Sequence, residues 1–307
     1  MRALKEWLTA GPLHVAPLCD LIKDYSGFEG LHLGSFECSS RALVTLRDGT
    51  VASGGAENAI CLFDPVGDRM PQRINHPEVF SLNAQLADKL LTGGADGVIR
   101  VFRLSDQACL QEFDGRAGPV FSLAVASNDK LASGATDSAV RVWDMSTGAC
   151  VSTLEGHTFP VFALEMLPSG LLASGSGDAT IRLWNTASAA CVRILQQHTS
   201  RVNALALLPD GCLASASSDR TVCVWDTTKG VCMRTLGGHR WSIWSLAVLP
   251  GGMLASGSGD VVHVWDASKS CCLMELQHRH ENCILNFAVM PDGELVTASV
   301  AGANIWE

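Results

Sequence analysis

Histidine, serine and aspartate recur together three times along the chain, and these are the residue types of a hydrolase triad. The three sets are His157, Ser174 and Asp178; His198, Ser215 and Asp219; and His239, Ser256 and Asp260. In each set the serine follows the histidine by 17 residues and the aspartate follows the serine by 4. Catalysis gives no reason to repeat one site at identical spacing. The repetition therefore favours a structural hydrogen-bond network over a catalytic site.

Two other groups of residues invite a chemical reading. His278, His280 and Cys283 are ligand types for Zn²⁺, but no fourth ligand and no Cys-x-x-Cys pair accompanies them, and His280 shares its repeat position with His157. The glycine-rich stretch 255–259 lacks the Gly-Lys-Ser/Thr ending of a phosphate loop and precedes a strand. We therefore expect no catalytic residue, no metal and no cofactor, and predict that the chain is not an enzyme.

The elements that position these residues follow from a repeat. An aromatic residue closes a short apolar strand at Phe63, Phe102, Trp143, Trp184, Trp225, Trp265 and Trp306, with gaps of 39, 41, 41, 41, 40 and 41 residues. A period of about 40 that ends in strand-Trp-Asp is typical of four-stranded propeller blades. Asp48-Gly49 and Asp210-Gly211 are hairpin-turn signals. The sequence predicts an all-β fold, a seven-bladed β-propeller of four-stranded antiparallel blades.

The repeated phrase reads His-x-x-x-Val, Leu-Pro-Asp-Gly, Leu-Ala-Ser-Gly-Ser-x-Asp and Ile-Arg-Val-Trp-Asp, and it resembles the repeat of the WD-repeat (WD40) β-propeller family over roughly residues 29–307. The resemblance implies a structural tetrad of Asp, His, Ser or Thr, and Trp in each blade. Trp184, Trp225 and Trp265 complete the three sets above. Other blades depart from the pattern: Arg116 replaces the histidine of blade three, His76 comes one position late in blade two, and blade seven has no aspartate.

The chain divides into residues 1–28 and the propeller, residues 29–307. The last blade lacks an outer strand within its own repeat, and Leu31–Leu33 is in register with the outer strand 151–154 of a complete repeat. We expect Leu31–Leu33 to close the ring and so remove exposed strand edges. Residues 1–28 are predicted to form a short N-terminal helical segment, because Pro17 can open a helix. Packing on the propeller and docking of a partner both remain open for it.

Composition narrows the partners. The net charge is −9 with only 22 lysines and arginines and no basic run, so we expect no nucleic-acid partner and no membrane association. Five of the 12 cysteines fall at one repeat position, namely Cys109, Cys150, Cys191, Cys232 and Cys272. They are predicted to be small buried apolar residues in a reducing compartment rather than disulfides. The expected location is cytoplasmic, with nuclear residence as the alternative.

One repeat position carries the candidate site. In the propellers that this chain resembles, the residue after the valine of His-x-x-x-Val faces the top of the central channel. Around the ring that position holds Arg41, Phe80, Phe121, Phe162, Asn203, Trp244 and Leu285. Arg201, Phe159 and Trp241 lie beside it in the same loops. Aromatic residues at the centre of a surface are typical anchors of protein interfaces. The alternative, that these side chains fill the channel, stays open.

These observations predict a non-enzymatic protein–protein interaction scaffold that binds partner peptides or loops on its aromatic-rich top face, as part of a multiprotein complex. The predicted partner-binding residues are Phe80, Phe121, Phe162, Trp244, Phe159, Trp241, Arg41 and Arg201. The alternative function is a substrate receptor of a ubiquitin ligase complex. Residues 1–28 are too few for a three-helix adaptor domain, and the sparse arginines disfavour phosphopeptide capture.

Overall fold

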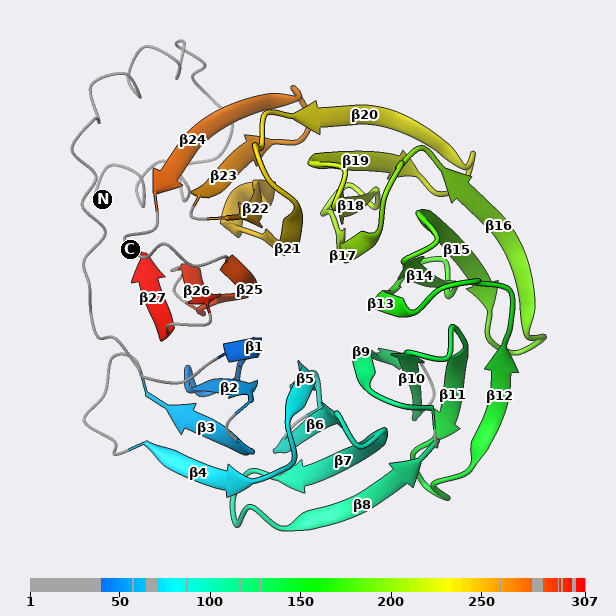
Figure 1. Cartoon of the computed structure of the whole chain (residues 1–307), viewed down its shortest axis with the longest axis vertical. Coiled ribbons are helices and arrows are strands. Elements are labelled where there is room, and N and C mark those ends of the chain that lie inside the picture. Colours follow the sequence, from blue (N-terminus) through cyan, green and yellow to red (C-terminus); the bar gives the residue numbers. More distant parts are fainter. Residues whose placement is uncertain are drawn as a thin grey trace.

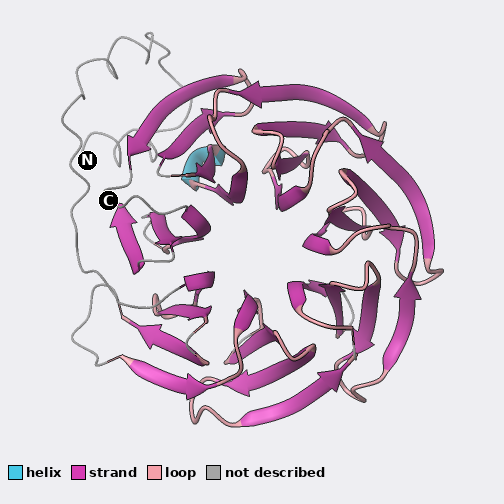
Figure 2. Ribbon diagram, viewed as in Figure 1, coloured by secondary structure: helices cyan, strands magenta, loops and turns pink. Residues whose placement is uncertain are grey.

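The computed structural model describes residues 40–56, 58–64, 71–86, 88–115, 117–126, 129–259, 261–277, 284–291, 293, 295–299 and 302–306. Its strands form seven antiparallel sheets arranged in a ring (Figure 1). Six sheets have four strands each and the seventh has three among the described residues. Figure 2 shows the first strand of each sheet at the inside of the ring and the fourth strand along its rim.

The sheets are numbered as blades one to seven in chain order. Blade one contains β1 (Ser40–Thr45), β2 (Val51–Gly55), β3 (Ala59–Phe63) and β4 (Gln72–Asn75). Blade two contains β5 (Val79–Asn83), β6 (Lys89–Gly94), β7 (Val98–Arg103) and β8 (Cys109–Asp114). Blade three contains β9 (Val120–Ala126), β10 (Lys130–Ala135), β11 (Val140–Asp144) and β12 (Cys150–Leu154). Blade four contains β13 (Val161–Met166), β14 (Leu172–Ser176), β15 (Thr180–Asn185) and β16 (Ala190–Gln196).

Blade five contains β17 (Val202–Leu207), β18 (Leu213–Ser217), β19 (Thr221–Asp226) and β20 (Val231–Gly237). Blade six contains β21 (Ile243–Val248), β22 (Leu254–Ser258), β23 (Val261–Asp266) and β24 (Cys271–Gln277), with the 3-10 turn η1 (Pro250–Gly252) between its first two strands. Blade seven contains β25 (Ile284–Val289), β26 (Leu295–Ser299) and β27 (Gly302–Trp306).

The predicted all-β propeller of four-stranded antiparallel blades is confirmed for six blades. The prediction of seven four-stranded blades is not, because the seventh sheet has three strands among the described residues. Leu31–Leu33 and the predicted helical segment 1–28 lie outside the described residues. Within the described ranges η1 is the one helical element, and none of their helices has the length and apolar character needed to cross a membrane.

The hydrophobic core is divided among the interfaces between neighbouring blades. Val140 and Leu154 of blade three pack with Leu164 and Trp184 of blade four in one such cluster. The same arrangement recurs around the ring, and the cluster that joins blade one to blade seven completes it. Both faces of a blade are therefore covered, which explains why the second strands β2, β14, β18 and β22 are buried at every position.

A directed chain of hydrogen bonds crosses blade four. The Trp184 indole N–H donates to Ser174 Oγ over 2.7 Å, and Ser174 Oγ lies 2.7 Å from His157 Nε2. His157 Nδ1 lies 2.8 Å from Asp178 Oδ2. With Nδ1 protonated, Trp184 donates to Ser174, Ser174 to His157 and His157 to Asp178, so each of the four side chains has a hydrogen-bond partner within the tetrad. Blade five repeats the chain with Trp225, Ser215, His198 and Asp219.

The departures from the tetrad take different forms. In blade two His76 still bonds Thr92 through Nε2, over 2.7 Å, but its Nδ1 lies 2.6 Å from the carbonyl oxygen of its neighbour Pro77. Asp96 is released and forms an ion pair with Arg100. The shift of His76 by one position, which the sequence shows, therefore keeps its hydrogen bond to Thr92 and removes only the hydrogen bond to Asp96. In blade three Trp143 donates to Ser133, while Arg116 lies outside the described residues.

Blade six keeps its tryptophan–serine–histidine contacts. Trp265 donates to Ser256 over 2.7 Å and His239 Nε2 lies 2.6 Å from Ser256 Oγ. Asp260 lies outside the described residues. His263 stacks on His239 with ring centroids 4.0 Å apart. Burial and the neighbouring His263 lower the pKa of His239 to about 3, so His239 is neutral at physiological pH.

Trp184→Ala should lower the free energy of unfolding by about 3–5 kcal/mol, because it opens a cavity in the core between blades three and four and removes the donor to Ser174. Urea unfolding followed by circular dichroism measures this loss. Val192→Ala is the matched control: Val192 lies in the outer strand of the same blade and is 52% exposed, so its replacement should change stability by less than about 0.5 kcal/mol. Equal losses for the two variants would contradict this account of the core.

Candidate functional site

Six of the predicted partner-binding side chains form one continuous stack around the inside of the ring. We call it the ring stack; its members are Arg41, Phe80, Phe121, Phe162, Arg201 and Trp244. The Arg41 guanidinium lies 5.0 Å from the centre of the Phe80 ring. The Phe80 and Phe121 rings meet edge to face at 5.2 Å, and the Phe121 and Phe162 rings lie 4.9 Å apart.

The other end of the ring stack crosses blade five. The Arg201 guanidinium carbon lies 4.3 Å from the centre of the Phe162 ring and 4.6 Å from that of Trp244. Arg201 is thus held between an aromatic ring of blade four and one of blade six. Cation–π contacts of this kind contribute about 0.5–2 kcal/mol each, with the larger values where water is excluded. The ring stack therefore links blades one to six.

A β-bulge explains why this repeat position leaves the blade. The first strand of each blade pairs with the second, and the pairing skips one residue: Val161 pairs with Ser176 and Ala163 with Gly175, so Phe162 has no partner. The skipped residues of the seven blades are Arg41, Phe80, Phe121, Phe162, Asn203, Trp244 and Leu285. A bulge redirects the extra side chain away from the regular pleat.

The ring stack is neither fully exposed nor part of the core. Phe80, Phe121, Phe162 and Trp244 are half-buried, and the interblade hydrophobic clusters do not include them. They bury much of their surface against one another. The four rings therefore lie on the innermost strands of the propeller, and each side chain is partly exposed, which is intermediate between an open binding face and a filled channel.

Phe159 and Trp241 lie outside the ring stack and are far more exposed. Phe159 is 58% exposed and Trp241 is 67% exposed. Two glycines next to tetrad aspartates make room for them: a Cβ on Gly177 would approach Phe159 Cβ to 3.0 Å, and a Cβ on Gly259 would approach Trp241 Cδ1 to 3.0 Å. The small residues noted in the sequence at this position thus allow the aromatic side chains to lie against the loops.

The two arginines of the ring stack differ in their electrostatic surroundings. Arg41 forms an ion pair with Glu78 at 2.5 Å. Arg201 donates from Nε to Asn203 Oδ1 over 2.5 Å, and Asn203 in turn donates to Ser218 Oγ and to the Ile243 carbonyl. Burial lowers the pKa of the Arg201 guanidinium, which still remains charged because arginine does not deprotonate in proteins. Glu78 was not recognised as the partner of Arg41 from the sequence.

The serine–histidine–aspartate sets of blades four and five have triad geometry but cannot perform triad chemistry. Ser174 is fully buried, and its oxygen already accepts from the Trp184 indole. A nucleophile must reach a substrate carbonyl, and no substrate atom can approach an oxygen in this position. The geometry therefore supports the structural interpretation made from the sequence repeat.

The described residues contain one cluster of potential metal ligands, His263, Cys272 and Glu275, whose ligand atoms lie within 4.8 Å of one another. His263 Nε2 lies 3.5 Å from Glu275 Oε1 across the β23–β24 pair. Cys272 and Glu275 are exposed on the outer strand. The sequence pattern did not reveal this cluster, because its members come from two strands and meet only through the pairing of His263 with Glu275. The candidate set His278, His280 and Cys283 lies outside the described residues.

The periodic cysteines correct one expectation. Cys109, Cys150, Cys191 and Cys272 are exposed and Cys232 is half-buried, not buried as predicted. They lie on the outer strands, each opposite the aromatic residue of the third strand at a bulge, as Cys191 lies opposite Trp184. The outer strand has no further strand beside it, so its side chains reach solvent. All described cysteines are free thiols.

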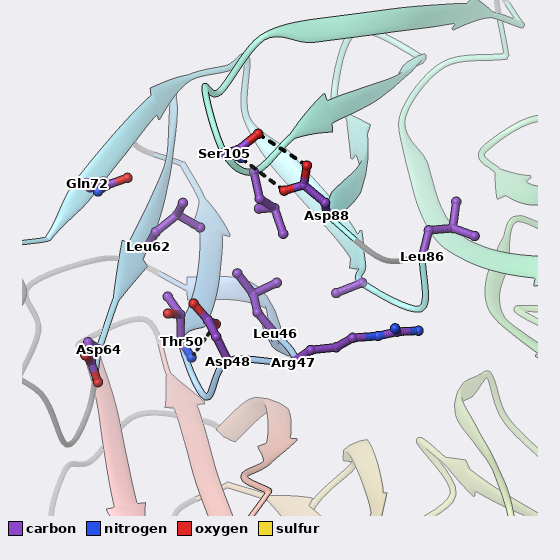
Figure 3. Close-up of a pocket in the computed structure, with 12 residues that line it drawn as sticks. Leu46, Arg47, Asp48, Thr50, Leu62, Asp64, Gln72, Leu86, Asp88 and Ser105 are labelled. Atoms are coloured by element: carbon purple, nitrogen blue, oxygen red, sulfur yellow. Dashed lines mark hydrogen bonds between the residues drawn. The ribbon is translucent and has the colours of Figure 1, made fainter.

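A cavity of about 430 Å³ lies between blades one and two, at the end of the propeller opposite to the ring stack (Figure 3). It is lined by the β1–β2 turn, which includes Leu46, Asp48 and Thr50, and by the β5–β6 turn, which includes Asp88. Its carboxylates stabilise turns: Asp48 accepts from the Thr50 amide over 3.0 Å, and Asp88 accepts from the Ser105 amide and hydroxyl. The cavity is distant along the strands from the ring stack and shares no residue with it.

The fold and the ring stack together define a β-propeller with an aromatic and cationic lining at one end. Residues 107–144, 148–185, 189–226 and 230–266 each match the family model for the WD domain, G-beta repeat. The chain belongs to the WD40-repeat family, whose propellers are generally non-enzymatic.

Solved structures share the fold. The structure is similar to the crystal structure of the WD40 β-propeller domain of Doa1, with a TM-score of 0.80 and 22% sequence identity over 91% of this chain and 95% of that one. This likeness concerns the fold alone. A comparison with curated protein sequences finds no significant match.

Glu165 of β13 is a perturbed carboxyl group outside the tetrads. Burial raises its pKa to about 7, and it forms no hydrogen bond or ion pair with the described residues. Asn83, at the same position of blade two, lies within 3.5 Å of the Leu123 carbonyl oxygen of the next blade, to which it donates. Glu165 has no such contact with the described residues, and burial removes water from its carboxylate, so its ionised form is disfavoured.

The contribution of Glu165 to the free energy of unfolding should therefore fall as the pH rises from about 4.3, the unfolded-state pKa of glutamate, to about 7. The folded state binds the Glu165 proton more tightly than the unfolded state across this window, so stability is lost as the carboxyl ionises. Glu165→Gln should remove this dependence and gain about 2 kcal/mol on the parent between pH 5 and pH 8. Urea unfolding of both proteins across this range measures the gain. A difference that does not change with pH would contradict the assignment.

Proposed function

We propose that this chain is a non-enzymatic protein-interaction scaffold that binds a peptide or loop of a partner protein over the ring stack. The continuous ring stack, flanked by the exposed side chains of Phe159 and Trp241, is the observation that carries the proposal. Exposed aromatic side chains around a half-buried aromatic floor are typical of the energetic centre of a protein interface. Membership of a multiprotein complex and a cytoplasmic or nuclear location are part of the same proposal.

The rigidity of the scaffold supports this function. The blades that contribute Phe162, Arg201 and Trp244 are also those with the most complete tetrads. Side chains that are already ordered lose little conformational entropy on binding, so more of the contact energy appears as affinity. A rigid, multi-bladed surface of this kind suits the assembly of several proteins on one platform.

The alternative, a substrate receptor of a ubiquitin ligase complex, has no supporting observation among the described residues. The segment through which a ligase adaptor would dock, residues 1–28, lies outside them. Copurification of ligase adaptor subunits would decide in its favour.

The triple variant Phe80→Ser, Phe121→Ser and Phe162→Ser should lose the partners that copurify with the parent chain, because it removes the aromatic floor of the ring stack. Quantitative mass spectrometry after affinity purification measures the loss. A matched control is Val151→Ser with Val192→Ser, which removes exposed apolar side chains from outer strands instead.

The triple variant must first be shown to fold by thermal melting. Since the three rings lie outside the interblade clusters, it should melt cooperatively and lose less stability than Trp184→Ala. Partners retained by the triple variant but lost from the outer-strand control would move the interface to the rim and overturn the proposal. A triple variant that does not fold would make the rings part of the core and would overturn it as well.

We also propose that Leu31–Leu33 adds a fourth strand to blade seven and so gives seven four-stranded blades. The supporting observation is that β27 is the outermost strand of its sheet among the described residues, whereas the other six sheets have four strands. An open strand edge favours pairing with a second chain.

Deleting residues 1–35 should therefore leave that edge open and cause aggregation, whereas deleting residues 1–28 retains the closing strand and should leave a folded monomer. Size-exclusion chromatography with light scattering distinguishes the two. A monomeric and stable product of the longer deletion would refute closure by Leu31–Leu33.

A further inference from the structure

Arg201 is the one charged member of the ring stack whose charge has no acidic partner among the described residues. Its Nε donates to the Asn203 side chain, and its guanidinium carbon lies 4.3 Å from the centre of the Phe162 ring and 4.6 Å from that of Trp244. Arg201 forms no ion pair with any described carboxylate, and the tetrad carboxylate of its own blade, Asp219, is bonded to His198 and Thr221. A partly buried guanidinium without a counter-charge is costly in an isolated protein and gains most when an anion reaches it.

The free part of the Arg201 guanidinium faces solvent. Its two terminal nitrogens form no hydrogen bond with the described residues, and neither is among the buried side-chain atoms that lack a partner. They are therefore accessible. Because Nε is already bonded, the available donors are those of the two terminal nitrogens, which form a fork that matches the two oxygens of a carboxylate.

The ring stack itself shows how such an arginine is satisfied. Arg41, at the other end of the stack, also lies against an aromatic ring, and its partner is the carboxylate of Glu78. In blade five the position of Glu78 is held by Arg201 itself, and in blade six it is held by Ser242, so neither blade supplies a glutamate there. The chain thus supplies a carboxylate to one arginine of the ring stack and leaves the other for a ligand.

The surroundings of Arg201 define what lies next to that carboxylate. Phe159 of blade four and Trp241 of blade six occupy the same repeat position, on either side of blade five, and both are exposed. An aromatic side chain therefore stands to each side of the cation. An extended peptide that places an acidic residue on Arg201 can lay apolar residues against both.

A single carboxylate fits better than a phosphate. A phosphate group carries a charge near −2 and is usually held by several arginines. Arg41 is already paired with Glu78, which leaves Arg201 as the one unpaired arginine of the ring stack. One guanidinium matches the single negative charge of an aspartate or glutamate.

We propose that Arg201 anchors an aspartate or glutamate side chain of a partner peptide, whose flanking apolar residues pack on Phe159 and Trp241. This inference rests on the proposed function and specifies the chemistry of the partner.

Selection of a displayed library of random short peptides on the parent protein tests it. The enriched peptides should carry Asp or Glu at one fixed position with apolar residues beside it. Their affinity, measured by fluorescence anisotropy, should fall about 10- to 100-fold in Arg201→Gln, the loss expected for a charge-assisted, bidentate hydrogen bond. Arg220→Gln is the matched control, since Arg220 is exposed in the same blade and lies outside the ring stack. This variant should bind the selected peptides with the affinity of the parent.

A second comparison keeps the test independent of any disturbance to the ring stack. Replacing the acidic residue of a selected peptide by its amide should weaken binding to the parent as much as Arg201→Gln does, and should cost nothing further in that variant. Arg201→Lys keeps the charge but loses the forked pair of donors, so its affinity for the peptide should lie between that of the parent and that of Arg201→Gln. Thermal melting confirms that each variant folds.

The outcomes separate this inference from the function beneath it. Peptides that lose binding in the triple phenylalanine variant but lack an acidic residue, or bind Arg201→Gln equally well, would overturn the carboxylate anchor and leave the scaffold proposal intact. A phosphoserine peptide that binds more than about tenfold tighter than its glutamate counterpart would overturn the choice of ligand. Peptides that bind the triple phenylalanine variant as tightly as the parent, or a selection that enriches no peptide, would count against the proposed function itself.

Discussion

The packing of each blade against its two neighbours is the constraint on which the rest of this structure depends. A blade is a small sheet with two apolar faces, and neither face can be covered within the blade itself. Val140 and Leu154 of blade three meet Leu164 of blade four, and the pattern continues until Leu43 of blade one meets Ala288 of blade seven. Because each cluster is shared, the stability of one blade depends on the presence of the next. The ring is the arrangement in which no face remains open.

The tetrads fix the loops at one end of each blade, and the bulges redirect one side chain of each first strand. The chain from Trp184 through Ser174 and His157 to Asp178 ties the third strand, the second strand and two loops together, and so fixes the end of the blade near the ring stack. The bulge at Phe162 then releases one side chain from the pleat of the first strand. A rigid loop end and one redirected side chain per blade together produce a preorganised surface.

The architecture could be predicted from the sequence because each propeller blade corresponds to one sequence repeat. The evenly spaced tryptophans from Trp143 to Trp265 give the period of that repeat without any knowledge of packing. The sequence also placed Phe80, Phe121 and Phe162 side by side, since their shared position within the repeat determines their place around the axis, but it did not contain the contacts of Arg201 with Phe162 and Trp244. What the repeat alone does not contain is the pairing between neighbouring blades. The Arg41–Glu78 ion pair joins blade one to the loop before blade two, and the periodic cysteines are exposed because nothing packs beyond the outer strand. His76 shows the same limit, since a shift of one position still lets its ring reach Thr92.

Arg201 illustrates how a cation can be retained in a half-buried position without an acid beside it. Cation–π contacts with Phe162 and Trp244 and a hydrogen bond to Asn203 offset part of its desolvation, and Asn203 is itself fixed by Ser218 and the Ile243 carbonyl. None of these groups neutralises the charge. A carboxylate arriving at the open edge would find its hydrogen-bond donors already oriented, so little conformational entropy would be lost and the full charge of the arginine would act at short range in a partly water-excluded site. The contacts with Phe162, Trp244 and Asn203 thus stabilise the charged Arg201 side chain in the free protein and also orient its remaining donors toward an anion.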